Sequence, residues 1–230
     1  QVIKSRFGID FTIQRFLKDP TPDGIVKCIG EMEKQIAAND KQPYIATIMN
    51  RKISGPVSLS PPQERLWFLH ELEPDKPLYN LVHVLRIDGK YEDDILKKAL
   101  KSFFNRHEVF RTYIDSGTGF AKLAFMDNAD IPVEIVDYTG YSIDDAEKSY
   151  EQSLKNEAIR PVNFAQYPVI KTIIFKFAFN LSRICLFVPH IFTDGWSSEI
   201  FLKEIKDIYN RITGGIEELP PVAIQYSDYA

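Results

Sequence analysis

The chain has 230 residues, of which 44% are apolar and 26% are charged, and its formal net charge at pH 7 is −4. This composition is typical of a folded globular protein, and the lack of a basic block excludes nucleic acid as the main partner. The sequence holds no run of about 18 apolar residues, so it predicts neither a membrane span nor a membrane partner. Its two cysteines, Cys28 and Cys185, lie far apart in the sequence. They favour a reducing cytoplasm over a disulfide framework or a metal site.

The first part of the chain, residues 1–38, predicts a small helical piece. A short helix is expected at 13–17, and a second helix at 23–37 carries apolar residues at intervals of three or four. Two short amphipathic helices bury too little surface to fold alone, so this piece is expected to belong to something larger. Residues 39–56 have no sustained period and contain Pro and Gly, which indicates a linker.

From residue 57 onward, strands alternate with helices. Helices are predicted at 62–73, 92–105, 143–159 and 199–212, the last of them beginning near Trp196, and strands at 79–87, 110–114, 122–125 and 133–137, with a hairpin formed by 169–179 and 183–188. Strands mixed with helices indicate an α/β sandwich, because neither a helical bundle nor an all-β fold gives this alternation.

One histidine, His190, lies between a dense apolar run and the last helix. The run 184–188 predicts a buried strand, so His190 follows where that strand opens into a loop, and Asp194 and Gly195 come shortly after. Histidine is the side chain best suited to moving protons near neutral pH. On periodicity alone, however, a histidine after an apolar strand is more often a satisfied core residue.

Three other clusters have structural explanations of their own. Residues 60–69, SPPQERLWFL, are consistent with a capped core helix anchored by a tryptophan. Residues 106–113, RHEVFRTY, place charges at a helix end, which is typical of dipole compensation and a solvated charge group. The end of the chain, 226–230, by itself indicates only an aromatic turn.

Taken together and in order, these four stretches resemble the condensation domains of nonribosomal peptide synthetases. The stretch 60–69 is similar to the motif S-x-A-Q-x-R-L-W-x-L, with Pro62 in place of Ala. The stretch that begins at Arg106 is similar to R-H-E-x-L-R-T-x-F, with Phe110 in place of Leu. The tail is similar to the start of Y-x-D-Y-A-x-W. A fourth motif, M-H-H-x-x-x-D-G-W-S, is matched at His190, Asp194, Gly195, Trp196 and Ser197.

The histidine motif departs from the family at Pro189, where the family usually carries its first histidine. The resemblance makes this position the less critical of the two, and the second histidine, His190, is kept. The heterocyclising branch of the family has aspartate at that place, so His190 also argues against that branch.

The resemblance implies amide formation between two carrier-bound substrates. The amine of the acceptor thioester attacks the carbonyl of the donor thioester, and His190 either takes the amine proton or holds the amine in line. No metal or nucleotide is required, because thioesters are already activated. Asp194 is expected to pair with Arg106 or Arg111 and so hold the loop. Gly195 would let the backbone pass close to substrate.

Two further residues of the motif have expected structural roles. Trp196 is expected to pack rather than react. Ser197 is expected either to cap the following helix or to point towards the tetrahedral intermediate, with capping favoured.

The resemblance also implies a domain organisation. Residues 1–38 are similar to the last helices of an acyl or peptidyl carrier domain, whose phosphopantetheine-bearing serine would lie upstream of Gln1. Residues 39–56 would be the linker. Residues 57–230 would form the N-terminal lobe, a chloramphenicol-acetyltransferase-like two-layer sandwich, and the site would lie in a tunnel shared with a C-terminal lobe. This fragment alone is then expected to be inactive or nearly so.

The implied partners are donor and acceptor carrier domains, the C-terminal lobe and neighbouring synthetase domains. 4′-Phosphopantetheine would be carried by the partner carriers and not bound by this chain. Two alternatives stay open. An epimerisation domain of the same superfamily would abstract an α-proton, and a non-catalytic carrier-docking module would use the fold only for binding.

Overall fold

The structure is a computed structural model that describes residues 19, 21–38, 55–77, 79–117, 120–216 and 219–229. The chain divides into two compact units, residues 1–47 and 48–230. In the first unit, α3 (Pro22–Ala38) agrees with the helix predicted at 23–37, and the Thr21 hydroxyl accepts a hydrogen bond from the Gly24 N–H at 3.0 Å at its start. The helix predicted at 13–17 and nearly all of the predicted linker lie outside the described residues.

The second unit alternates strands and helices as the sequence predicts. Its elements are β1 (Val57–Ser58), α4 (Pro61–Leu72), β2 (Asn80–Asp88), α5 (Asp93–Arg106), the 3₁₀ helix η1 (Glu108–Arg111), β3 (Thr112–Asp115), β4 (Lys122–Phe125), β5 (Val133–Asp137), α6 (Ile143–Ala158), β6 (Lys171–Ala178), β7 (Leu181–Pro189), α7 (Gly195–Thr213) and the 3₁₀ helix η2 (Tyr226–Asp228). The strand predicted at 110–114 is the main difference, because its first two residues belong to η1 and β3 begins only at Thr112.

The larger sheet has the strand order β2-β7-β6-β5. The predicted hairpin is confirmed as β6 and β7, which are antiparallel and joined by the two residues Phe179 and Asn180. Strands β5 and β6 are parallel, and α6 is the crossover helix between them, as a parallel pair requires. Strand β2 pairs with β7 from Asn80 opposite Pro189 to Asp88 opposite Leu181. The start of β2 therefore lies beside the end of β7, where His190 follows.

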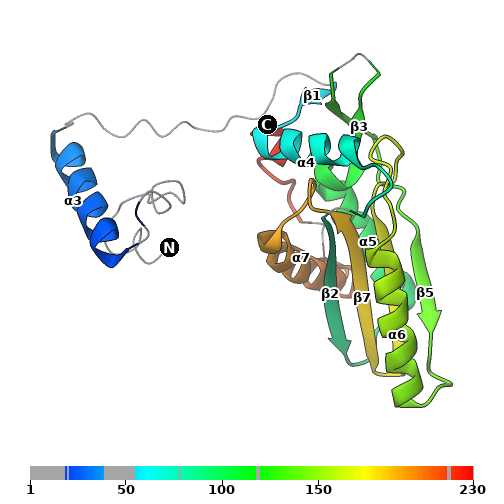
Figure 1. Ribbon diagram of the computed structural model, residues 1–230. Coiled ribbons are helices and arrows are strands. Elements are labelled where there is room, and N and C mark those ends of the chain that lie inside the picture. Colours follow the sequence, from blue (N-terminus) through cyan, green and yellow to red (C-terminus); the bar gives the residue numbers. More distant parts are fainter. Residues whose placement is uncertain are drawn as a thin grey trace. The chain divides into compact units, whose positions relative to one another are not determined.

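Apolar side chains cover both faces of this sheet, because successive residues of a strand point to opposite sides. On β7, Ile184, Leu186 and Val188 pack in one core cluster with residues of α5 and α7. Cys185 and Phe187 pack in a second cluster with residues of α6. Figure 1 shows α6 in front of the strands. The unit is thus an α/β lobe in which α5 and α7 cover one face and α6 covers the other.

A smaller sheet has the order β1-β4-β3. Its strand β3 directly follows η1, and η1 packs against η2 near the end of the chain. Figure 1 shows the C-terminal segment next to α4. Across the described residues, we find no helix that is long and apolar enough to cross a lipid bilayer.

Candidate functional site

The loop between β7 and α7 places His190 at the end of the larger sheet. Pro189 ends β7, and its carbonyl accepts a hydrogen bond from the Phe192 N–H at 3.0 Å, which closes a turn. The His190 N–H donates to the Tyr79 carbonyl at 2.8 Å, so the loop is also tied to the residue before β2. Tyr79 has a φ of 60°, in the left-handed region that non-glycine residues adopt rarely. The side chain of His190 is exposed rather than buried in the core.

The imidazole of His190 is held by one hydrogen bond. Its Nδ1 lies 2.7 Å from the carbonyl oxygen of Thr193. A carbonyl oxygen can only accept, so Nδ1 carries the hydrogen and, in the neutral ring, Nε2 is the unprotonated nitrogen. Within the described residues, Nε2 has no hydrogen-bond partner. The ring is therefore oriented, and the nitrogen that can accept a proton is free.

His190 lies in the wall of a cavity of about 590 Å³. The cavity is formed by the start of α4, the loop around His190, the first turn of α7 and the C-terminal segment. Its lining residues are Pro62, Gln63, Arg65, Leu66, Tyr79, His190, Ile191, Phe192, Thr193, Asp194, Ser197 and Tyr226. Three of the four sequence motifs therefore contribute to one cavity.

The first motif holds the loop beside His190. Gln63 is 3% exposed, and its Oε1 accepts from the backbone N–H of Ser60 at 3.1 Å and from the Ser60 hydroxyl at 3.2 Å. Its Nε2 donates to the carbonyl of Ile191 at 3.1 Å. The Ser60 hydroxyl also lies 2.9 Å from the hydroxyl of Tyr226. The expected capped helix is thus present, and its cap also binds the loop next to His190 and the tail motif.

Asp194 has a different role from the predicted one. Its Oδ1 accepts from the Ser197 N–H at 3.1 Å and from the Ser197 hydroxyl at 3.0 Å, and the Asp194 N–H donates to that hydroxyl at 3.2 Å. This reciprocal arrangement is a capping box that starts α7. The predicted ion pair of Asp194 with Arg106 or Arg111 is wrong, because both arginines bind other groups. Ser197 takes part in capping, as favoured, from the third helical position.

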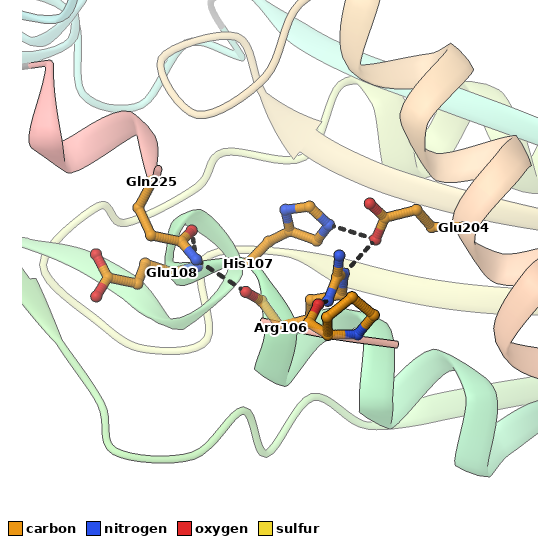
Figure 2. A network of polar contacts seen from close by, with 6 residues as sticks. Arg106, His107, Glu108, Glu204 and Gln225 are labelled. Carbon is orange, nitrogen blue, oxygen red and sulfur yellow. Dashed lines mark hydrogen bonds and ion pairs between the residues drawn. The ribbon is translucent and has the colours of Figure 1, made fainter. Parts of the chain in front are cut away.

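The second motif ties α5 to α7 and to the C-terminal segment, as Figure 2 shows. Arg106 Nε and His107 Nε2 each lie 2.8 Å from Glu204 Oε2 on α7. Arg106 also donates to the carbonyl of Pro220. Gln225 accepts from the Glu108 N–H and donates to the Arg106 carbonyl, both at 3.0 Å. The cluster is thus more than a solvated charge group.

Besides Arg106, three predicted support residues lie outside the cavity lining. Arg111 donates from Nη1 to the carbonyls of Met126 at 2.6 Å and Asp127 at 3.2 Å. Trp196 is 63% exposed, so the expectation that it packs is wrong for the described residues. A Cβ added to Gly195 would meet no other atom within 4 Å, and within the described fold glycine is not needed there for steric reasons.

One histidine beside the site, His83, is not among the residues predicted from the sequence. His83 is 7% exposed on β2, and its ring nitrogens lie 2.5 Å from the Ser198 hydroxyl and 3.0 Å from the Thr193 hydroxyl. Burial is the main cause that lowers the pKa of His83; the Asp194 charge opposes this change, and His190 adds to it. Its only sequence signal is a histidine flanked on each side by two apolar residues in the strand YNLVHVLRI.

The chain is similar to a known family and to several known proteins. The sequence matches the Condensation domain family over residues 53–230. It is also similar to two proteins of the linear gramicidin synthase of Brevibacillus parabrevis, with 26% identity over 229 residues to one and 28% identity over 232 residues to the other. Each alignment covers 99% of this chain but only 3% and 4%, respectively, of those much longer relatives.

Solved structures show the same fold. The first condensation domain of the calcium-dependent antibiotic synthetase, in complex with a substrate analogue, gives a TM-score of 0.67 at 20% identity. That match covers 74% of this chain and 40% of the solved chain. A complex of the X-domain and OxyB from teicoplanin biosynthesis gives 0.69 at 21% identity, covering 80% of this chain and 39% of that one.

The fold and the histidine loop define a lobe of the chloramphenicol-acetyltransferase-like class, to which condensation domains belong. The family match spans most of the chain. The chain belongs to the condensation domains of nonribosomal peptide synthetases.

Proposed function

We propose that residues 57–230 form the N-terminal lobe of a condensation domain that joins two carrier-bound substrates through an amide bond. One observation carries this proposal. His190 lies in the wall of a cavity of about 590 Å³, with Nδ1 bound to the Thr193 carbonyl and Nε2 left as the acceptor. An oriented nitrogen base beside a space of this size is what attack by an amine requires.

The proposed reaction needs only the substrates and a site for one proton. The amine nitrogen of the acceptor bonds to the carbonyl carbon of the donor thioester, the C–S bond breaks, and the amine proton ends on the departing thiol. His190 Nε2 either carries that proton or holds the amine in line for attack. Gly195 would let a substrate approach the backbone closely, because the space next to its Cα is open.

We further propose that residues 1–38 are the end of a carrier domain and residues 39–56 a linker. Support comes from the alignments with the two gramicidin synthase proteins, which extend over 99% of this chain and so include this region. The partners are then donor and acceptor carriers bearing 4′-phosphopantetheine thioesters, a C-terminal lobe and neighbouring synthetase domains. A cytoplasmic location fits the free thiols of Cys28 and Cys185.

The test uses the complete condensation domain, with both lobes, and donor and acceptor carriers loaded as phosphopantetheine thioesters. Intact-protein mass spectrometry follows the acceptor carrier, whose mass rises by the donor acyl group when the amide forms. His190→Ala is compared with wild type and with His70→Ala. His70 is the control because its ring stacks on Phe164 and does not line the cavity.

We expect mass transfer in wild type and His70→Ala and its loss in His190→Ala. His190→Gln separates the two roles, because an amide oxygen can accept a hydrogen bond but is not a base. Substantial transfer by this variant would assign His190 to positioning, and loss equal to that of alanine would assign it to proton transfer. Absence of transfer in every protein would contradict amide formation. Exchange of the substrate α-proton in deuterium oxide would then identify an epimerisation domain, and no exchange would leave the docking module.

A further inference from the structure

His83 occupies an unusual place for a histidine. It lies opposite Leu186 in the pairing of β2 with β7, and Leu186 belongs to the core cluster that packs with α5 and α7. His83 therefore points to the face of the sheet covered by α7. Thr172 of β6 lies opposite Leu186 on its other side, so His83 and Thr172 are two buried polar residues in one row across the sheet.

Both ring nitrogens of His83 have partners from other elements. Nδ1 lies 2.5 Å from the hydroxyl of Ser198 in the first turn of α7. Nε2 lies 3.0 Å from the hydroxyl of Thr193 in the loop. A neutral imidazole has one donor and one acceptor, and a hydroxyl can serve as either, so the neutral ring satisfies both contacts at once. The lowered pKa of His83 favours this neutral form.

Thr193 links His83 to the proposed catalytic histidine. The Thr193 side chain contacts His83, while the Thr193 carbonyl accepts the Nδ1–H of His190 at 2.7 Å. Thr193 is itself 6% exposed. A shift of this one residue would therefore move the acceptor that determines both the tautomer and the direction of the His190 ring.

We propose that His83 is a positioning residue. By binding Thr193 and Ser198, it keeps the Thr193 carbonyl hydrogen-bonded to Nδ1 of His190. Nε2 of His190 is then left directed to the cavity. This role rests on the proposed condensation reaction. His83 acts through Thr193 and does not itself contact substrate. Its two hydrogen bonds join β2 to the loop and to the start of α7.

The test is a double-mutant cycle in the complete condensation domain with loaded carriers. His83→Phe keeps an aromatic ring but removes both hydrogen bonds, and Thr193→Val removes the hydroxyl but keeps the carbonyl that binds His190. The matched control is Thr172→Val, because the Thr172 hydroxyl is buried and has no hydrogen-bond partner among the described residues. The transfer rate is measured in single turnovers at saturating carrier, and the folded fraction is followed by circular dichroism.

We expect each single variant to transfer about tenfold to a hundredfold more slowly than wild type, because small misplacement of a catalytic group costs rates of that order. The carrier concentration at half-maximal rate should stay unchanged, as should the folded fraction. The double variant should be no slower than the slower single variant, since both changes break the same link. Thr172→Val should match wild type. A rate within about twofold of wild type for His83→Phe, or fully multiplicative effects, would overturn the proposal.

A second measurement does not depend on transfer. Long-range ¹H–¹⁵N NMR of the His190 ring identifies which of its two nitrogens carries the hydrogen. Wild type should show the hydrogen on Nδ1, while His83→Phe and Thr193→Val should show a mixture of the two tautomers, because the Thr193 carbonyl no longer holds the Nδ1–H. The same tautomer in all proteins would overturn the positioning role. A wild type that shows no transfer would instead contradict the proposed function, and the tautomer would still decide whether His83 orients His190.

Discussion

The buried amide of Gln63 gives the sharpest test of how the first motif supports the site. Replacement by leucine keeps the side-chain volume, so no large cavity forms, but it removes every hydrogen bond of the amide. The Ser60 N–H and the Ile191 carbonyl then lose their side-chain partner, and both residues are buried. The Ser60 hydroxyl keeps its contact with Tyr226.

The magnitude follows from these two groups. An unsatisfied buried polar group costs about 1–3 kcal/mol, so two cost about 4 kcal/mol at the middle of that range. Burial of the leucine side chain offsets about 2 kcal/mol. We therefore expect Gln63→Leu to lower the free energy of unfolding by about 2 kcal/mol. Urea unfolding followed by circular dichroism measures this, and the midpoint should fall by about 1 M for a slope near 2 kcal/mol per molar.

Two further variants test the hydrogen bonds assigned to Gln63. Glu64→Ala changes an exposed neighbour on the same helix, and its unfolding free energy should stay within about 0.5 kcal/mol of wild type. Gln63→Glu keeps the acceptor for Ser60 but turns an oxygen towards the Ile191 carbonyl. Burial raises the pKa of such a carboxyl above its unfolded value, so its stability is full at low pH and is lost as pH rises. If Gln63→Leu were as stable as Glu64→Ala, or Gln63→Glu gained stability with pH, the assigned hydrogen bonds would be wrong.

Three other substitutions and the reactivity of Cys185 have defined outcomes. Glu204→Ala leaves Arg106 without its carboxylate partner, and the free energy of unfolding measured in urea should fall by about 2 kcal/mol. An unchanged urea midpoint would contradict the link between α5 and α7. Asp194→Ala removes the cap of α7 and should lower the free energy of unfolding by about 1 kcal/mol in the same assay. A loss several times larger would instead support an ion pair of Asp194 with an arginine. Gly195→Ala should raise the melting temperature, because alanine favours a helix and the space for its methyl group is open. The same methyl group should slow transfer if substrate passes close to Gly195. An unchanged transfer rate would show that substrate does not pass there. Burial raises the pKa of the Cys185 thiol to about 11, so only about one molecule in a thousand carries the thiolate at pH 8. Native protein should therefore resist alkylation of Cys185, as measured by mass spectrometry. Rapid labelling would contradict the burial of this thiol.

Much of the fold could be predicted because its signals are local. The periodic apolar residues of α5 and the dense apolar run of β7 predict a helix and a strand without knowledge of their partners. The start of α4 could also be predicted, since the spacing of Ser60 and Gln63 is that of a capping box. The start of β3 at Thr112 differs from the predicted start at residue 110. Residues 108–111 turn as a 3₁₀ helix, and the Thr112 hydroxyl binds the Glu108 carbonyl at 2.7 Å.

The sequence alone identified His190 and the four motifs, because each motif is a short pattern of residue types. It could not choose the partners of the charged and polar side chains, which depend on the pairing of distant strands and helices. Asp194 accepts hydrogen bonds from Ser197 in the first turn of α7, whereas Arg106 binds Glu204 in the middle of that helix. His83 and Thr193 are 110 residues apart and meet only because β2 pairs with β7 in one register. Local chemistry thus determined which residues the site uses, and the long-range register of the sheet decided which of them hold His190 in place.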